Sequence, residues 1–348
     1  MNRAALIASL GELRIRPLFE SGRWNLICDE SFEQLIKSWG DVGNRIIPAA
    51  SLAENVELGR LKGPIAVCTE KPEGPAQLLL REHGRPSLGL FSQIVPRLAA
   101  GLPPRYALPA SNDAKVEFAI LCSGRCGSTL LSRELRAAGA GKPGEHLRPP
   151  VLTLLRHRKV SGFDFYRWWD LVRLGHTSEG VFGTKVIFGF WLAAKEFMTK
   201  DEQNCFLEFL GRATIMHISR RDRVAQAVSD FVANKTGVWH LLKGGEREAY
   251  DISAAQIEAD VATLVSIYDR YAKHEEAISS LIQASGGRLL EIDYEDLAAD
   301  PKLVVARAVE ALGLKASSSY FATDVKLEPT TTAAHQVLGH LLRRALAK

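Results

Sequence analysis

Long apolar runs are absent from this 348-residue sequence, and no stretch approaches the roughly 18 consecutive apolar residues that a membrane-spanning helix needs. The first twenty residues, MNRAALIASLGELRIRPLFE, mix apolar residues with arginines and lack the continuous apolar core of a signal peptide. From these two absences we expect no transmembrane segment and a cytoplasmic location.

Cysteine is scarce, and its five residues form an odd, scattered set that fits reduced thiols better than a disulfide framework. CxxC pairs, HExxH and clustered Cys/His spacings are all absent, so we expect no metal cofactor. Cys122 and Cys126 stand four residues apart. Small buried thiols are the ordinary interpretation of that pair, and a redox or metal role remains the alternative.

The sequence also lacks a strong excess of one charge, because 44 Lys and Arg residues against 40 Asp and Glu residues leave +4 at pH 7. No long Lys/Arg run with interleaved aromatics occurs, so we expect an anionic small ligand rather than nucleic acid. GxSxG is absent as well, which leaves a serine hydrolase of the α/β type without support.

What the sequence does contain is an alternation of β-branched runs with helical patterns after a Pro- and Gly-rich stretch at 101–115. This alternation predicts an α/β fold with a central parallel sheet flanked by helices. We place an N-terminal accessory subdomain of unknown role at 1–112 and an α/β domain at 113–348. The predicted strands are 116–122, 180–188, 213–220 and 287–294.

Between the last two of these strands, apolar residues three or four apart predict one long helix whose face begins at Ile257 and continues through Val261, Leu264, Tyr268 and Tyr271. Core packing is the ordinary role of such a face. A dimer seam is the alternative, so a homodimer stays open.

The stretch CSGRCGSTLL at 122–131 joins the strand VEFAILC to a helix. Free backbone N–H groups at a helix start bind phosphate or a similar oxyanion, and the helix dipole favours the negative charge. Gly124 and Gly127 let the main chain come close, Arg125 adds a fixed charge, and Ser128 and Thr129 add hydroxyl donors. The loop is neither GxxxxGK[ST] nor GxGxxG, which argues against ordinary ATP or GTP hydrolysis and against a dinucleotide site.

A second motif, RRDRVAQAVS, follows the strand ATIMHISR. Arg221 and Ser229, eight residues apart, are able to hold one terminal phosphate from two directions, with the arginine bidentate. The alternative is a salt-bridged helix start with Asp222 as its cap.

Together the two motifs resemble the 5′-phosphosulfate loop and the 3′-phosphate motif of sulfotransferases that use PAPS (3′-phosphoadenosine 5′-phosphosulfate). Within that superfamily, with its P-loop-NTPase-like fold, the sequence is most similar to the bacterial trehalose 2-sulfotransferase-like family, with a cysteine at 126 where that family has the first serine of RSGSTLL. The resemblance implies donor contacts from both motifs. The implied donor-binding residues are Ser123, Gly124, Arg125, Cys126, Gly127, Ser128, Thr129, Arg221 and Ser229.

The resemblance extends over roughly residues 116–315 and implies catalytic residues. GAGKPGEHL looks like the family's G-x-P-x-E segment and puts the general base at Glu145, while FGTKVIF puts the strand lysine at Lys185. KTGVWH resembles the family's T-x-VW segment, which includes Trp239. His146 stands where the family has an aromatic residue, so histidine is a second candidate for the base. Residues 326–336 lack the arginine-rich pattern that would give a further donor contact.

The sequence therefore predicts a sulfotransferase that moves a sulfuryl group from PAPS to a hydroxyl of a carbohydrate or glycolipid, with Arg125, Glu145, Lys185 and His146 as catalytic candidates. Two alternatives remain. One is a divergent nucleotide-binding or phosphoryl-transfer protein of the P-loop type, and the other is a non-catalytic module that binds the bisphosphate.

Overall fold

The computed structural model describes the chain except for residues 23, 41–44, 58–60, 62, 105–112, 242–246 and 323–329, and gives only the backbone at 12, 21, 22, 57, 321 and 322. The described chain divides into two compact units. The first holds residues 1–112 together with 148–175, and the second holds 113–147 and 176–348. The domain limits 1–112 and 113–348 stay a prediction, and the segment 148–175 groups with the first unit. Most of the proposed linker, 105–112, lies outside the described residues.

The first unit contains a parallel sheet in the order β2-β1-β3-β4. All four residues of β1 and of β3 are buried, which is typical of parallel strands covered on both faces. The strands are β1 (Asn25–Cys28), β2 (Arg45–Pro48), β3 (Ile65–Cys68) and β4 (Leu88–Gly89). The helices are α1 (Arg3–Ser9), α2 (Ile15–Gly22), α3 (Glu30–Ser38), α4 (Leu52–Glu57), α5 (Gly74–Glu82), α6 (Val95–Ala99), α8 (Pro149–Arg156), α9 (Arg158–Ser161) and most of α10 (Phe165–His176).

The second unit contains a five-stranded parallel sheet in the order β6-β7-β5-β8-β9. The α/β fold class is therefore confirmed, and each of the four predicted strands has a counterpart here. The strands are β5 (Val116–Cys122), β6 (Gly144–Glu145), β7 (Val181–Ile187), β8 (Thr214–Ser219) and β9 (Arg288–Asp293). Sequence patterns missed β6, since two residues are too short to show an alternation.

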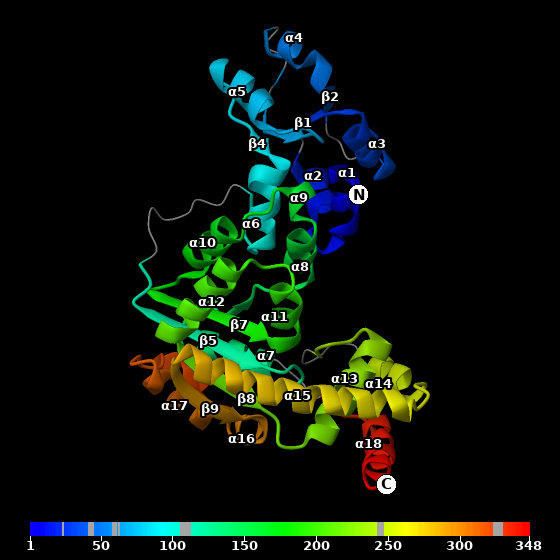
Figure 1. Cartoon of the computed structure of the whole chain (residues 1–348), viewed down its shortest axis with the longest axis vertical. Coiled ribbons are helices and arrows are strands. Elements are labelled where there is room, and N and C mark those ends of the chain that lie inside the picture. Colours follow the sequence, from blue (N-terminus) through cyan, green and yellow to red (C-terminus); the bar gives the residue numbers. More distant parts are fainter. Residues whose placement is uncertain are drawn as a thin grey trace. The chain divides into compact units, whose positions relative to one another are not determined.

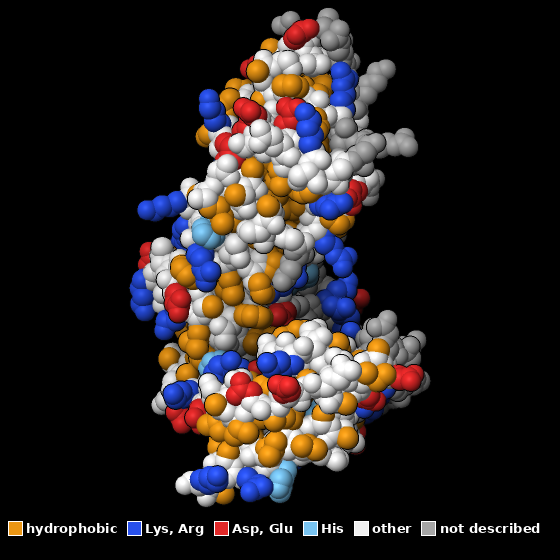
Figure 2. All heavy atoms as spheres, turned by 90° about the vertical axis from the view of Figure 1, so that its right-hand side faces the viewer, with side chains coloured by type: hydrophobic (Ala, Val, Ile, Leu, Met, Phe, Trp, Pro, Cys, Tyr) orange, Lys and Arg blue, Asp and Glu red, His pale blue; other side chains and the backbone are white. Residues whose placement is uncertain are grey.

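The helices of the second unit are α7 (Ser128–Ala137), α11 (Phe188–Lys195), α12 (Lys200–Arg212), α13 (Arg223–Thr236), α14 (Arg247–Ala255), α15 (Val261–Ser285), α16 (Tyr294–Ala299), α17 (Pro301–Ala311) and α18 (Ala333–Leu346). Several of them contact the strands of this sheet, whereas the main contacts of α14 and α18 are with α13 (Figure 1). Among the described residues, none of the helices is both long and apolar enough to cross a bilayer. Charged and hydrophobic side chains are mixed over the molecular face that Figure 2 shows.

The long predicted helix exists as α15, but it begins at Val261, so Ile257 lies outside it. The Asp260 side chain accepts a hydrogen bond from the Thr263 N–H and caps the helix. Leu264 and Tyr271 are buried on the predicted face against α13, which shows that this face serves the core of the unit.

The strand order determines where a site can form. After β5 the chain forms β6 and β7 on one side of that strand, and it then crosses to form β8 and β9 on the other side. The direction of the connections therefore reverses between the neighbouring strands β5 and β8. In such sheets ligands bind beyond the carboxyl ends of the strands at the point of reversal. The loop after β5 and the RRDR segment after β8 both lie at this position.

Candidate active site

The loop after β5 has a backbone shaped for an anion. Gly124 (φ +96°), Arg125 (φ +53°) and Gly127 (φ +83°) all adopt left-handed conformations just before α7. Left-handed residues next to right-handed ones turn successive N–H groups toward one side, which makes an anion-binding concavity. Gly127 is also required sterically, because a Cβ there would lie 2.4 Å from Cδ2 of Tyr294.

The Arg125 side chain is held by groups from distant parts of the chain. Its Nε and Nη2 donate to Ser229 Oγ on α13 at 3.0 and 2.9 Å, and its Nη1 donates to the Trp239 carbonyl at 2.6 Å. Nη2 also lies 3.4 Å from Thr330 Oγ1. Burial lowers the pKa of Arg125 from its usual value. The structure thus brings together Arg125 and Ser229, which the sequence separates by about a hundred residues.

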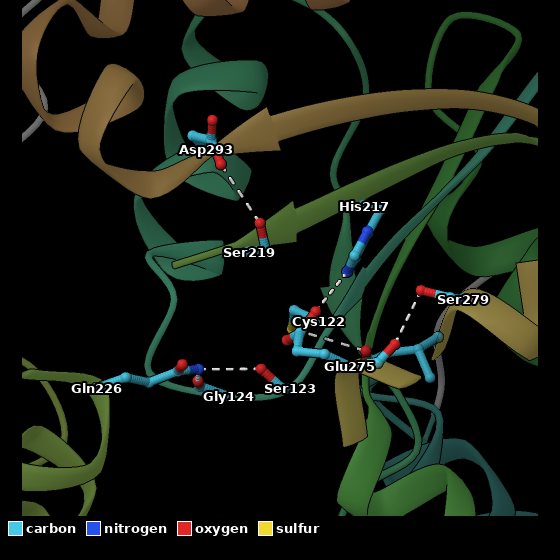
Figure 3. Close-up of polar contacts among 10 residues, drawn as sticks. Cys122, Ser123, Gly124, His217, Ser219, Gln226, Glu275, Ser279 and Asp293 are labelled. Atoms are coloured by element: carbon cyan, nitrogen blue, oxygen red, sulfur yellow. Dashed lines mark hydrogen bonds and ion pairs between the residues drawn. The ribbon is translucent and has the colours of Figure 1, made fainter. Parts of the chain in front are cut away.

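Three of the side chains predicted to bind the sulfuryl donor PAPS point into the protein interior. Ser123, Cys126 and Ser128 are buried, so contacts from these positions would come through their backbone N–H groups. A hydrogen bond to Cys122 and burial raise the pKa of the Cys126 thiol. Figure 3 shows the Ser123 side chain directed toward Gln226, which lies on α13.

A second polar group lies at the carboxyl end of β7. Lys185 Nζ is 2.8 Å from Glu145 Oε2 and donates to Thr129 Oγ1 at 3.3 Å. The register pairs Glu145 of β6 with Lys185 of β7, so both side chains leave the same face of the sheet. Thr129 Oγ1 in turn lies 3.3 Å from Nε2 of His240, which no sequence pattern had singled out. Burial, followed by the charges of Arg125 and Lys185, lowers the pKa of His240 to about 4.

His146 follows β6 and reaches Thr184, which lies on the opposite face of β7 from Lys185 because adjacent residues of a strand alternate. Its Nδ1 is 3.0 Å from Thr184 Oγ1, and its buried ring packs on His176 and Phe182. Glu145 is therefore the better placed of the two candidates for the base, because it is the one that reaches Lys185 and the loop.

The two arginines of the RRDR segment have different surroundings. Arg221 is 58% exposed in its side chain and pairs with Asp293, Glu295 and Asp296. Its hydrogen bond to Asp296 raises its pKa. No contact joins Arg221 to Ser229 among the described interactions. Arg220, in contrast, lies over the Tyr294 ring and donates from Nη1 to the Arg125 carbonyl at 3.4 Å.

Near the loop, two buried N–H donors have no partner among the described residues. One is Arg220 Nε, and the other is Nε2 of His335 on α18. Nδ1 of His335 accepts the Thr332 N–H at 3.2 Å, so the neutral ring carries its proton on Nε2. Burial, then Arg125, Arg220 and Arg247, lower the pKa of His335 to about 4. The neutral His335 ring has an unpartnered N–H donor, and three positively charged arginines lie near it. This combination suits the binding of an anion.

A comparison with protein-family models identifies the family of the chain. The family model described as "Stf0 sulphotransferase" matches residues 117–335, which is more than half of the chain. The chain belongs to the Stf0 sulfotransferase family. The predicted resemblance is confirmed, and the match includes the loop after β5, Glu145, Lys185 and the RRDR segment.

One solved structure similar to the chain is the sulfotransferase domain from the Synechococcus PCC 7002 olefin synthase. It is 15% identical with a TM-score of 0.33, and the alignment covers 70% of this chain and 98% of that one. No curated protein matches the chain.

In this Stf0 family member, sequence patterns missed Gln226, His240 and His335. Gln226 lies within the RRDRVAQAVS motif and His240 directly after Trp239, so both could have been found by their place in the motifs. His335 could not, since it reaches the loop only through the position of α18. Of the segment 326–336, residues 326–329 lie outside the described part. No three His, Cys, Asp or Glu side chains in the described residues are grouped to hold a metal ion.

Proposed function

We propose that this sulfotransferase moves a sulfuryl group from PAPS to a hydroxyl of a carbohydrate or glycolipid. The proposal is carried by two anion-binding places at the carboxyl ends of the strands. One is the left-handed loop before α7, and the other is formed by the unpartnered N–H donors of Arg220 and His335. PAPS has two separate anionic ends, a 5′-phosphosulfate and a 3′-phosphate, and fits two such places. When bound, PAPS supplies an activated sulfuryl group whose transfer leaves the 3′,5′-bisphosphate.

The residues of the chain have distinct tasks in this reaction. The loop amides with Arg125 and Thr129 stabilise the charge that develops on the leaving oxygen, as preorganised donors do in phosphoryl transfer. Glu145 takes the proton from the acceptor hydroxyl. Lys185, between Glu145 and Thr129, orients that carboxylate and adds positive charge beside the sulfuryl oxygens.

For the 3′-phosphate we propose Ser229 with an arginine of the RRDR segment. Arg221 is the residue implied by the sequence motif, but three carboxylates surround it. Arg220 has a free buried Nε–H and touches the loop. Separate variants at 220 and 221 distinguish the two.

A carbohydrate acceptor is supported by Trp239. Its carbonyl accepts a hydrogen bond from Arg125, yet the residue is 45% exposed beside the loop. A large aromatic surface that is apolar on its face and polar at its N–H suits a sugar ring with its mixed apolar and hydroxyl surface.

A thermal-shift titration with adenosine 3′,5′-bisphosphate tests the donor, with 5′-AMP and ATP as controls, on the wild type and on Arg220→Ala and Arg221→Ala. A ligand at a hundred times its dissociation constant stabilises the fold by about 2.7 kcal/mol. We expect selective stabilisation by the bisphosphate, reduced in the variant that loses the 3′-phosphate contact. An equal shift with ATP would favour a nucleotide-binding protein of the P-loop type. Bisphosphate binding without transfer to any sugar hydroxyl would favour the non-catalytic module.

A further inference from the structure

The loop after β5 is anchored from beneath by one amide side chain. Gln226 on α13 is 1% exposed, and its Nε2 donates to Ser123 Oγ at 2.9 Å and to the Gly124 carbonyl at 2.6 Å (Figure 3). One side chain therefore holds both residues that lead from the strand into the loop.

A second polar pair lies beside Ser123. Oε2 of Glu275, on α15, is 2.9 Å from Nε2 of His217. Burial opposes ionisation of Glu275, but the neighbouring His217 and Ser123 side chains outweigh it and lower the pKa of Glu275. The Ser123 hydroxyl accepts the hydrogen bond from Gln226 with one of its lone pairs.

Holding a carbonyl also orients the amide on the other side of the same peptide. The described peptide bonds include no cis bond, so the Gly124 C=O and the Arg125 N–H point in opposite directions. Gln226 holds the carbonyl on the buried side, and the Arg125 N–H therefore points to the open side of the loop. Arg220 orients the next peptide in a similar manner. It donates a hydrogen bond to the Arg125 carbonyl, so the Cys126 N–H points away from Arg220.

We propose that Gln226 is a positioning residue for sulfuryl transfer, which keeps the Arg125 N–H directed at the 5′-phosphosulfate by holding the Gly124 carbonyl beneath the loop. This inference rests on the function proposed above. Two residues of α13 therefore contact Arg125 and its loop in different ways: Ser229 accepts hydrogen bonds from the Arg125 side chain, and Gln226 orients the Arg125 backbone N–H through the Gly124 carbonyl.

The test compares Gln226→Met with Gln203→Met. Gln203 of α12 is a matched control, since its Nε2 also donates to two acceptors, the carbonyls of Lys195 and Met198, both at 3.2 Å. Each variant loses two hydrogen bonds and keeps the length of the side chain. The measurements are the affinities for adenosine 3′,5′-bisphosphate and for adenosine 3′-monophosphate, together with kcat.

Removing one oxyanion donor costs about 100- to 1000-fold in kcat. A donor that is misdirected rather than removed costs less, so we expect Gln226→Met to lower kcat about 10- to 100-fold. The bisphosphate should bind about 10-fold more weakly while the 3′-monophosphate binds unchanged, because only the bisphosphate has a 5′ anion for the Arg125 N–H. Gln203→Met should alter neither affinity nor kcat.

Gln226→Glu provides a second variant of the same shape. At neutral pH its carboxylate cannot donate to the Gly124 carbonyl, whereas a protonated carboxyl at lower pH can, so kcat relative to the wild type should recover as the pH is lowered toward 5. An unchanged ratio of the two nucleotide affinities in Gln226→Met, or no pH rescue in Gln226→Glu, would overturn the role of Gln226 alone. A wild type without preference for the bisphosphate would overturn the proposed function as well.

Discussion

Replacing Gly127 by alanine tests whether the loop owes its shape to the close approach of Tyr294. The added Cβ would lie 2.4 Å from Cδ2 and 3.0 Å from Cε2 of that ring, and the backbone φ of +83° disfavours any side chain. The left-handed conformation costs roughly 1–2 kcal/mol, and overpacking adds roughly 1–3 kcal/mol. We therefore expect the free energy of unfolding to fall by about 2–5 kcal/mol.

Gly286→Ala is the control, because Gly286 has a φ of +67° and no atom within 4 Å of a Cβ built on it. It should lose only the conformational part, about 1–2 kcal/mol. Urea unfolding of both variants gives the difference, which measures the contact with Tyr294. Since Arg220 lies over the same ring, only Gly127→Ala should also weaken bisphosphate binding. Equal destabilisation of the two variants would refute the argument that Tyr294 fixes the loop.

Three further predictions concern the side chains around the loop. Glu145→Gln should lower kcat about 100-fold or more, with the affinity for the bisphosphate within about 2-fold of wild type, as kinetics and calorimetry would show; near-normal kcat would remove Glu145 from the base role. Ser229→Ala takes the acceptor from two Arg125 N–H groups, so bisphosphate binding measured by calorimetry should weaken about 10-fold or more; unchanged affinity would contradict the pairing. His335 has a pKa of about 4 when folded against about 6.5 unfolded, so the unfolded chain binds more protons between these values and stability falls as the pH drops from 6.5 to 4. His335→Asn, which retains an acceptor for the Thr332 N–H, should show a smaller decrease in melting temperature over that range, and an identical decrease would argue against the shift.

The motifs were readable because local chemistry fixes them. Glycines at 124 and 127 permit left-handed backbone, a hydroxyl-rich helix start binds anions, and apolar periodicity distinguishes strands from helices. From these features the α/β class, the loop after β5 and the sulfotransferase family could be predicted. The start of α15 was misplaced, because the apolar spacing continues through Ile257 although Asp260 caps the helix later.

Only the tertiary structure decided how the motifs meet. The strand order β6-β7-β5-β8-β9 puts Glu145 beside Lys185 and brings α13 beneath the loop. It also gives adjacent arginines opposite surroundings, with Arg221 among carboxylates and Arg220 against the loop. The sequence by itself determined which residues are fit to bind an anion and to take a proton, because these are properties of single side chains and short turns. Which of them share a site depends on sheet order and helix packing, contacts between residues up to about two hundred positions apart, and these leave no local pattern in the sequence.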